Sequence, residues 1–295
     1  MVEGILLIDK PGDWTSFDVV AKVRRLTGQR RTGHGGTLDP MATGVLPVFL
    51  GRATKIIDLI EDHDKRYTAS VRLGISTDTQ DTTGTVLEER DASGISLAQL
   101  NEVFAALTGD ILQIPPMYSA VQVGGVRLYK LARQGMEIDR PARPAHVEFI
   151  NILEYKPEEH TLTIDVKCSK GTYIRTIIDD AGTALGCGAA MSGLRRTEAL
   201  GFRIEDCLTL EQLKQAAQQG RAQALCKGLE TPFEGLPALH LTGKQAKLFL
   251  NGVRLELARL PGYSAGKQRV YCDGGFTALA QPDEATGILK MIKML

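Results

Sequence analysis

One carboxylate stands out in the segment from Gly33 to Pro47, GHGGTLDPMATGVLP, where Asp39 lies among four glycines and two prolines. Glycine permits backbone conformations and close approaches that other residues exclude. A carboxylate held rigidly on such a loop is suited to act as a nucleophile or as a general base. The alternative is a simple turn, because Asp before Pro commonly begins one. Composition alone favours the turn.

Two better-known loop chemistries do not fit this sequence. The segment lacks the third glycine of a dinucleotide-binding fingerprint, and no Gly-Lys-Ser/Thr follows it to bind phosphates. Further along, residues 262–266 match the G-x-S-x-G elbow of serine hydrolases, but no histidine follows His240 to complete a triad. We interpret that second match as a surface turn.

Charge is distributed unevenly along the chain of 295 residues. The net charge is zero, which argues mildly against a nucleic-acid partner. A run of cations with no acid nevertheless occurs near the N-terminus, and it is either a solvated helix face or part of a basic surface. The run consists of Lys22, Arg24, Arg25, Arg30 and Arg31.

Cysteine and histidine spacing predicts neither a metal site nor a redox motif. The five cysteines contain no Cys-x-x-Cys pair, and the five histidines form no short-spaced ligand pair. Reduced thiols are typical of a cytoplasmic protein. No apolar run reaches the roughly 18 residues of a membrane helix, and acids at Glu3 and Asp9 are atypical of a signal peptide.

Hydrophobic periodicity predicts an α+β fold with a mixed, largely antiparallel sheet, because helices and strands mix without a regular βαβ order. We expect a helix with Ser16 as its N-cap (with Phe17, Val20, Val23 and Leu26 on one face), a second after a capping box of Ser96 and Gln99, and a third starting at Thr209. We also expect helices over 53–60 and 175–185. We expect strands over 5–10, 66–73, 146–155 and 161–168, the last two as a hairpin.

Two segments stand apart from this pattern. Residues 114–144 are rich in Pro, Gly and Arg, with a helix-like patch over 128–133, and they are interpreted as an excursion from the core. Beyond residue 236 the pattern changes to short strands and turns, with Pro232 and Pro237 on either side of the change. We therefore expect one domain over 1–235 and a second, small and mostly β, over 236–295.

Three ordered motifs together resemble the TruB family of bacterial tRNA pseudouridine synthases. They are the Asp39 loop, LLIDKPGDWTS (residues 6–16) and KGTYIRT (residues 170–176), and the likeness runs along nearly the whole chain. The resemblance implies a sheet of the pseudouridine-synthase type, a thumb at about 114–144 that clamps RNA, and a C-terminal RNA-binding domain of the PUA type. It also implies a cytoplasmic enzyme, expected as a monomer, that converts uridine 55 in the T stem-loop of tRNA.

The implied reaction breaks the bond from ribose C1′ to uracil N1 and joins C1′ to uracil C5. It is an isomerisation that requires no cofactor and no metal. The resemblance gives the carboxylate role to Asp39 and makes Arg175 its partner, which would hold it with two parallel hydrogen bonds. Tyr67 would stack on the base, which must leave its stack to react. The residues alone favour an ordinary core aromatic of a strand for Tyr67, and they fit Arg175 equally well as a surface residue at the start of a helix.

Further positions carry over as substrate-binding residues. His34 would fill the space left by the flipped base, Leu194 would pack beside that base, and Lys10 and Thr37 would support the loop. Phosphate contacts are expected from the thumb and from the tail. The thumb candidates are Arg127, Lys130, Arg133, Arg140 and Arg143, and the tail candidates are Lys244, Lys247, Arg254, Arg259, Lys267 and Arg269.

Two other functions remain open at this point. The protein could bind and fold tRNA without modifying it, if Asp39 were idle. It could also be an aspartyl-nucleophile phosphotransferase, which would require Mg²⁺ and further acids near Asp39. Asp18 and Asp58 are the nearest in sequence, and neither lies in a ligand motif.

Overall fold

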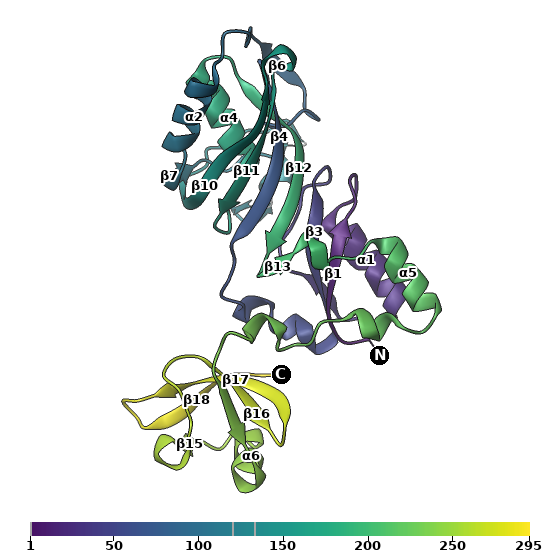
Figure 1. Ribbon diagram of the computed structural model, residues 1–295, viewed down its shortest axis with the longest axis vertical. Coiled ribbons are helices and arrows are strands. Elements are labelled where there is room, and N and C mark those ends of the chain that lie inside the picture. The colour runs from purple at the N-terminus through teal and green to yellow at the C-terminus, as the bar shows by residue number, and fades with distance from the viewer. Residues whose placement is uncertain (1, 120, 133) are drawn as a thin grey trace.

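A computed structural model describes residues 2–119, 121–132 and 134–295 (Figure 1). Its helices are α1 (Ser16–Thr27), α2 (Leu97–Ala106), α3 (Leu128–Ala132), α4 (Ile174–Leu185), α5 (Leu210–Gln218) and α6 (Gly243–Leu250). Among the described residues, no helix combines the length and apolar character needed to span a membrane.

One mixed sheet organises the first 235 residues. Its strands run in the order β1-β3-β12-β4-β11-β10-β7, with β2 paired to β3 and β13 paired to β12. Among these described strands only β3 and β12 pair in parallel, so the predicted α+β fold with a largely antiparallel sheet is confirmed. The strands are β1 (Gly4–Lys10), β2 (Thr32–His34), β3 (Thr43–Leu50), β4 (Lys65–Leu73), β7 (Gly109–Gln113), β10 (Arg143–Lys156), β11 (Thr161–Cys168), β12 (Ala189–Ala199) and β13 (Phe202–Arg203).

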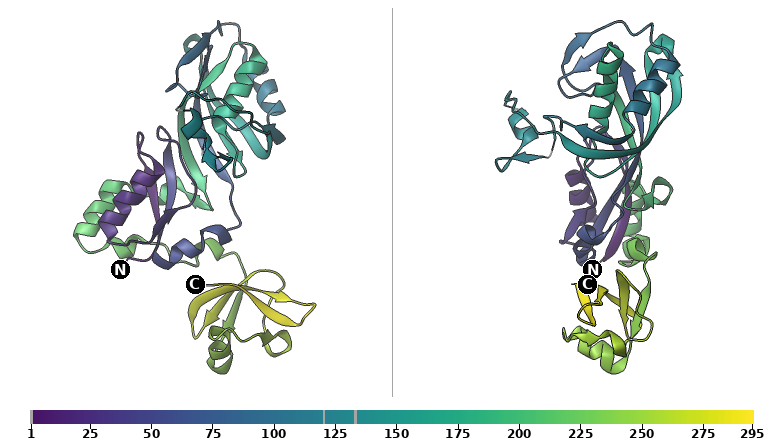
Figure 2. Two further views of the ribbon diagram at one scale, coloured as in Figure 1. Left: turned by 180° about the vertical axis from the view of Figure 1, so that it is seen from behind. Right: turned by 90° about the vertical axis from the view of Figure 1, so that its left-hand side faces the viewer.

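Two small hairpins project from this sheet. One joins β5 (Ile75–Thr77) to β6 (Val86–Glu89), and the other joins β8 (Gln122–Val123) to β9 (Val126–Arg127). The second hairpin and α3 stand away from the body of the molecule in the right-hand view of Figure 2. This hairpin and α3 lie within residues 114–144, where the sequence predicts an excursion from the core, and β10 already begins at Arg143.

Helices cover the sheet in two groups. Helices α2 and α4 pack on the part formed by β4, β10, β11 and β12, where the alternating residues Tyr67, Ala69, Val71 and Leu73 are buried as predicted. Helices α1 and α5 pack against β1 and β3. Figure 1 shows the groups as separate blocks, joined by the long strands β4 and β12.

Two details of the predicted α1 helix are wrong. Thr15, not Ser16, caps the helix, because Thr15 and Asp18 form a capping box. The side chain of Ser16 instead contacts the Asp39 loop. Phe17, predicted on the buried face, is 67% exposed, and Val19 lies in the core in its place. The predicted helix over 53–60 is two short 3-10 helices, Gly51–Lys55 and Ile57–Leu59.

The chain after residue 237 forms a mostly β domain with its own core. The strand order is β14-β16-β17-β18-β15. The strands are β14 (Ala238–Leu241), β15 (Leu255–Glu256), β16 (Gln268–Cys272), β17 (Gly275–Asp283) and β18 (Ile288–Met294). Strand β14 and helix α6 were not predicted. Leu279 of this domain packs with Phe233 and Ile5 of the first.

Gly44 shows why glycine is needed where β3 meets β12. Its φ is +103°, and a Cβ there would lie 2.1 Å from the carbonyl oxygen of Arg196. The contact is between two backbones, so no side-chain rotation relieves it. Glycine at this position lets β12 run beside the end of the Asp39 loop.

We predict that Gly44→Ala lowers the free energy of unfolding by about 2–4 kcal/mol, through left-handed strain and overpacking. Denaturant unfolding provides the measurement. Gly94→Ala is the matched control, because a Cβ at Gly94 meets no atom within 4 Å. Equal stability of the two variants would contradict this reading of Gly44.

Candidate active site

Asp39 and Arg175 meet although they lie far apart in sequence. The Nε of Arg175 lies 3.0 Å from Oδ2 of Asp39, so the predicted ion pair is confirmed. Arg175 sits in the first turn of α4 with its side chain 5% exposed, whereas the side chain of Asp39 is 37% exposed. The alternative of a surface position for Arg175 is therefore wrong.

The rest of the Arg175 guanidinium is held by other segments. Nη1 donates to the carbonyl oxygen of Thr79 at 3.0 Å, and Nη2 donates to that of Tyr118 at 2.9 Å. Asp81 places a carboxylate oxygen 3.9 Å from Nη1. The expected pair of parallel hydrogen bonds to Asp39 is therefore wrong, because the two terminal nitrogens are already engaged. Arg175 instead presents one edge to Asp39.

A second arginine, Arg196 on β12, holds the loop from inside and was not found from the sequence. It is fully buried, and Nε donates to the carbonyl oxygen of Val45 at 2.8 Å. Its terminal nitrogens donate to the carbonyls of Thr37 and Gly36 at 3.3 and 3.1 Å. Removal from water lowers the pKa of Arg196. Three loop carbonyls replace water around this charge.

Two further residues, Lys10 and Ser16, hold the loop next to Asp39. Lys10, also fully buried, donates from Nζ to the carbonyls of Pro11 and Pro40 at 2.8 and 3.0 Å. Ser16 Oγ accepts from the backbone N–H of Leu38 at 2.9 Å. These contacts fix the residues on either side of Asp39. The carboxylate itself remains partly open to solvent.

Tyr67 lies on β4 beside this loop and is buried, with 7% of its surface exposed. Desolvation raises the pKa of its hydroxyl to about 12, and a hydrogen bond with Arg196 acts in the opposite direction. The hydroxyl therefore stays protonated at neutral pH and can donate a hydrogen bond. Leu194 on β12 pairs with Ala69 of β4, and it packs on the same apolar cluster as Tyr67.

His34 and Thr37 lie at the start of the same loop. Burial lowers the pKa of His34, so the ring is neutral at pH 7, and its buried Nδ1 has no hydrogen-bond partner within the described ranges. Thr37 is exposed and contributes its carbonyl oxygen to Arg196. Whether these residues bind substrate stays a prediction.

The predicted phosphate-binding cations are not equally available. Arg127, Lys130 and Arg143 are exposed. Arg140 lies 3.3 Å from Glu137 with only 17% of its side chain exposed, and Arg133 lies outside the described residues. In the tail, Arg259 pairs with Glu256.

Two tail cations are part of the junction between the domains. Lys267 pairs with Glu61 at 2.7 Å and donates to the carbonyl of Leu59. Arg269 donates to the carbonyl of Leu236 and to the hydroxyl of Tyr271. Neighbouring residues hold both of these side chains in this structure, and whether Lys267 and Arg269 also contact RNA stays a prediction.

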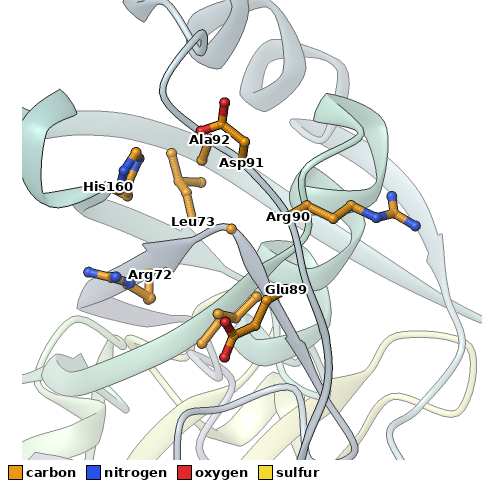
Figure 3. Close-up of a pocket in the computed structure, with 9 residues that line it drawn as sticks. Arg72, Leu73, Glu89, Arg90, Asp91, Ala92 and His160 are labelled. Carbon is orange, nitrogen blue, oxygen red and sulfur yellow. The ribbon is translucent and has the colours of Figure 1, made fainter.

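A hollow of about 320 Å³ lies elsewhere, at the other end of β4 (Figure 3). It is lined by Arg72, Arg90, Asp91 and His160 among others. Five residues of extended strand, about 17 Å, separate Arg72 from Tyr67. Arg72 and Arg90 donate to the backbone carbonyls of Glu159 and Gly186. This hollow is therefore distinct from the Asp39 site.

Comparisons of the sequence and of the fold with known proteins point to the same class of protein. Residues 24–174 match the model of the TruB family pseudouridylate synthase N-terminal domain, and residues 175–235 match that of the tRNA pseudouridylate synthase B C-terminal domain. The tRNA pseudouridine synthase B of Dehalococcoides mccartyi (strain CBDB1) is 41% identical over 96% of this chain and 93% of its own. That of Geotalea uraniireducens is 44% identical over 85% and 81%.

Among solved structures, a Cbf5-Nop10-Gar1 complex matches with a TM-score of 0.72 and 25% identity, over 99% of this chain and 84% of that one. A structure of an H/ACA RNP bound to a substrate RNA, at 24% identity and the same TM-score, shares the fold. Fold and site together define an isomerase of the pseudouridine synthase class. Within that class, the chain belongs to the TruB family of pseudouridylate synthases.

The burial of Lys10 gives a prediction about pH. Desolvation lowers the pKa of Lys10 to about 8 in the folded protein, while an unfolded lysine titrates near about 10.4. At a pH between these two pKa values, Lys10 is protonated in the unfolded chain and neutral in the folded protein. The contribution of this group to stability therefore rises as pH rises through that window.

We expect the free energy of unfolding of the wild type, relative to Lys10→Met, to be larger at about pH 9.5 than at about pH 7.5. Denaturant unfolding at both pH values measures it. Lys244→Met, at an exposed position, corrects for the general effect of removing a lysine charge. A difference between wild type and Lys10→Met that does not change with pH would refute the assignment.

Proposed function

We propose that this protein converts uridine 55 in the T loop of tRNA to pseudouridine and that Asp39 supplies the essential carboxylate. The names of the relatives support a tRNA substrate, since each is described as tRNA pseudouridine synthase B. The observation that carries the proposal is the geometry of Asp39. It is fixed 3.0 Å from the buried Arg175 and yet remains 37% exposed.

The reaction needs a carboxylate that is ionised and correctly aimed. Arg175 pairs with Asp39 at 3.0 Å, while Lys10 and Ser16 hold the backbone on either side of it. The carboxylate then attacks the target nucleotide or removes a proton from its sugar, while the bond from C1′ to N1 breaks. The uracil turns, and C1′ joins C5 as the bond to Asp39 breaks or as Asp39 returns the proton to the sugar.

The last step takes the proton from C5 and returns a proton to N1, whose bond to C1′ has broken, so that no atom is lost. Tyr67 is the proposed group beside the base. Its protonated hydroxyl donates a hydrogen bond to the uracil while its ring packs against the base. To reach Asp39 the nucleotide must leave its stack, and a T loop presents bases that are already unpaired. His34, neutral and with an unpartnered Nδ1 among the described residues, is the proposed contact where the base leaves its stack.

We propose that residues 1–235 form the catalytic domain and that residues 236–295 bind RNA as a PUA-like domain. Exposed cations of the thumb, Arg127, Lys130 and Arg143, would contact the T-arm backbone. The exposed tail cations Lys244, Lys247 and Arg254 would contact a more distant part of the tRNA. Among the described residues, none forms an ion pair or a hydrogen bond with the side chain of Lys244, Lys247 or Arg254.

We predict that Asp39→Asn reduces pseudouridine formation at least about a hundredfold and leaves the dissociation constant for tRNA within a few-fold. Unmodified tRNA transcript is incubated with enzyme in EDTA, and pseudouridine is mapped along the RNA. Asp58→Asn is the matched control, since Asp58 is exposed. Pseudouridine at another uridine would revise the target. Turnover by Asp39→Asn above a hundredth of wild type would refute the role of Asp39.

We predict that replacing Lys244, Lys247 and Arg254 together by glutamine weakens binding of full-length tRNA and makes its salt dependence shallower. Each phosphate contact that the substitutions remove reduces the log–log slope by about 0.7–0.9. Binding and turnover on a short T-arm hairpin should not change, since the candidate site lies in the first domain. An unchanged salt slope for full-length tRNA would remove this surface from RNA binding.

A further inference from the structure

Gln80 lies in the turn between β5 and β6, directly between two residues that contact Arg175. The preceding residue, Thr79, accepts a hydrogen bond from Nη1 of Arg175 at 3.0 Å. The following residue, Asp81, lies 3.9 Å from the same nitrogen. A shift of this turn would therefore move both contacts relative to the guanidinium that pairs with Asp39.

The side chain of Gln80 binds the helix that carries Arg175. Its Oε1 accepts from the hydroxyl of Thr176 at 2.9 Å, and its Nε2 donates to Oδ2 of Asp179 at 2.8 Å. Thr176 follows Arg175 directly on α4, and Asp179 lies one turn further along. One amide thus uses both its acceptor and a donor to join the turn to α4.

The backbone of the same residue binds the turn to β12. The carbonyl oxygen of Gln80 accepts from the N–H of Met191 at 3.1 Å, and the N–H of Thr82 donates to the carbonyl of Met191 at 2.9 Å. Gln80 holds these contacts with a φ of +62°, a conformation that glycine adopts far more readily. The turn alone would favour glycine, so the side-chain contacts give a reason for glutamine.

We propose that Gln80 is a positioning residue for catalysis, which fastens the 78–85 turn to α4 and thereby fixes the orientation of the Arg175 guanidinium toward Asp39. This inference rests on the proposed function, since its effect on turnover is read from pseudouridine formation. Gln80 is not expected to touch the RNA. Its replacement should therefore slow the chemical step while tRNA binding is retained.

A charge swap tests the contact between Gln80 and Asp179. Gln80→Glu places two carboxylates against each other, so the turn should move away from α4. Asp179→Asn added to it restores a hydrogen bond, because the asparagine amide donates to the new carboxylate at position 80 while Thr176 still donates as before. We expect Gln80→Glu to lower the single-turnover rate at least about tenfold with the tRNA dissociation constant within about threefold. The double variant should recover to within about threefold of Asp179→Asn.

A second readout does not depend on turnover. In ¹⁵N-labelled protein, the Nε–H signal of Arg175, assigned with Arg175→Lys, should move in Gln80→Glu and return in the double variant. Gln215→Glu, on the exposed surface of α5, controls for added charge. A wild type that forms no pseudouridine would overturn the proposed function, whereas the Arg175 signal would still decide the inference about Gln80.

Two results of the charge swap would contradict the proposed role of Gln80. A wild-type rate with an unmoved Arg175 signal in Gln80→Glu would overturn the proposal, as would a folded double variant no faster than Gln80→Glu. If Gln80→Glu fails to melt cooperatively, Gln80→Gly replaces it, because glycine accepts the positive φ and removes only the side chain. We expect its single-turnover rate to fall at least about fivefold, and a wild-type rate there would refute the role of Gln80.

Discussion

The site depends on how two buried guanidinium groups are satisfied. A buried charge is costly unless hydrogen bonds replace its water. Arg196 uses the carbonyls of Gly36, Thr37 and Val45, and Arg175 uses those of Thr79 and Tyr118. Each carbonyl belongs to an irregular segment or to the end of a strand, where regular pairing does not supply every partner. The arginines and these segments therefore order each other, and Asp39 is fixed as a result.

This arrangement explains why the site draws on distant parts of the sequence. Arg175 joins the Asp39 loop, the turn after β5 and the segment before β8, while Arg196 joins the loop to β12 and to Tyr67. Any change that loosens one segment exposes a buried charge in another. Substitutions near Asp39 should therefore lower stability and activity together, and a comparison of kcat with tRNA affinity is needed to separate the two.

The second domain is joined to the first by a small set of mixed contacts. Lys267 pairs with Glu61, Arg269 bonds the linker at Leu236, and Leu279 packs with Phe233. Lys267 and Arg269 are two of the cations that are expected from the sequence to contact phosphates. Helix α6, which carries the exposed Lys244 and Lys247, lies away from the junction (Figure 1). Under the proposed function, the tail would extend the RNA surface without supplying a group to the Asp39 site.

The sequence by itself determined the elements whose signals are local. Hydrophobic alternation located β4 and β11, a capping box at Ser96 located α2, Thr209 marked the start of α5, and the glycine-rich loop identified Asp39. The resemblance added the partner Arg175. The sequence did not identify Arg196, Asp81 or Gln80, and it misplaced Phe17. Arg196 lies in the strand sequence Arg195-Arg196-Thr197, which by itself is typical of a solvent-exposed strand. Its burial and its hydrogen-bond partners depend on segments that lie far away in the chain. Only the tertiary structure brought those carbonyls and carboxylates together, because hydrogen bonds between distant segments leave no periodic pattern in the sequence.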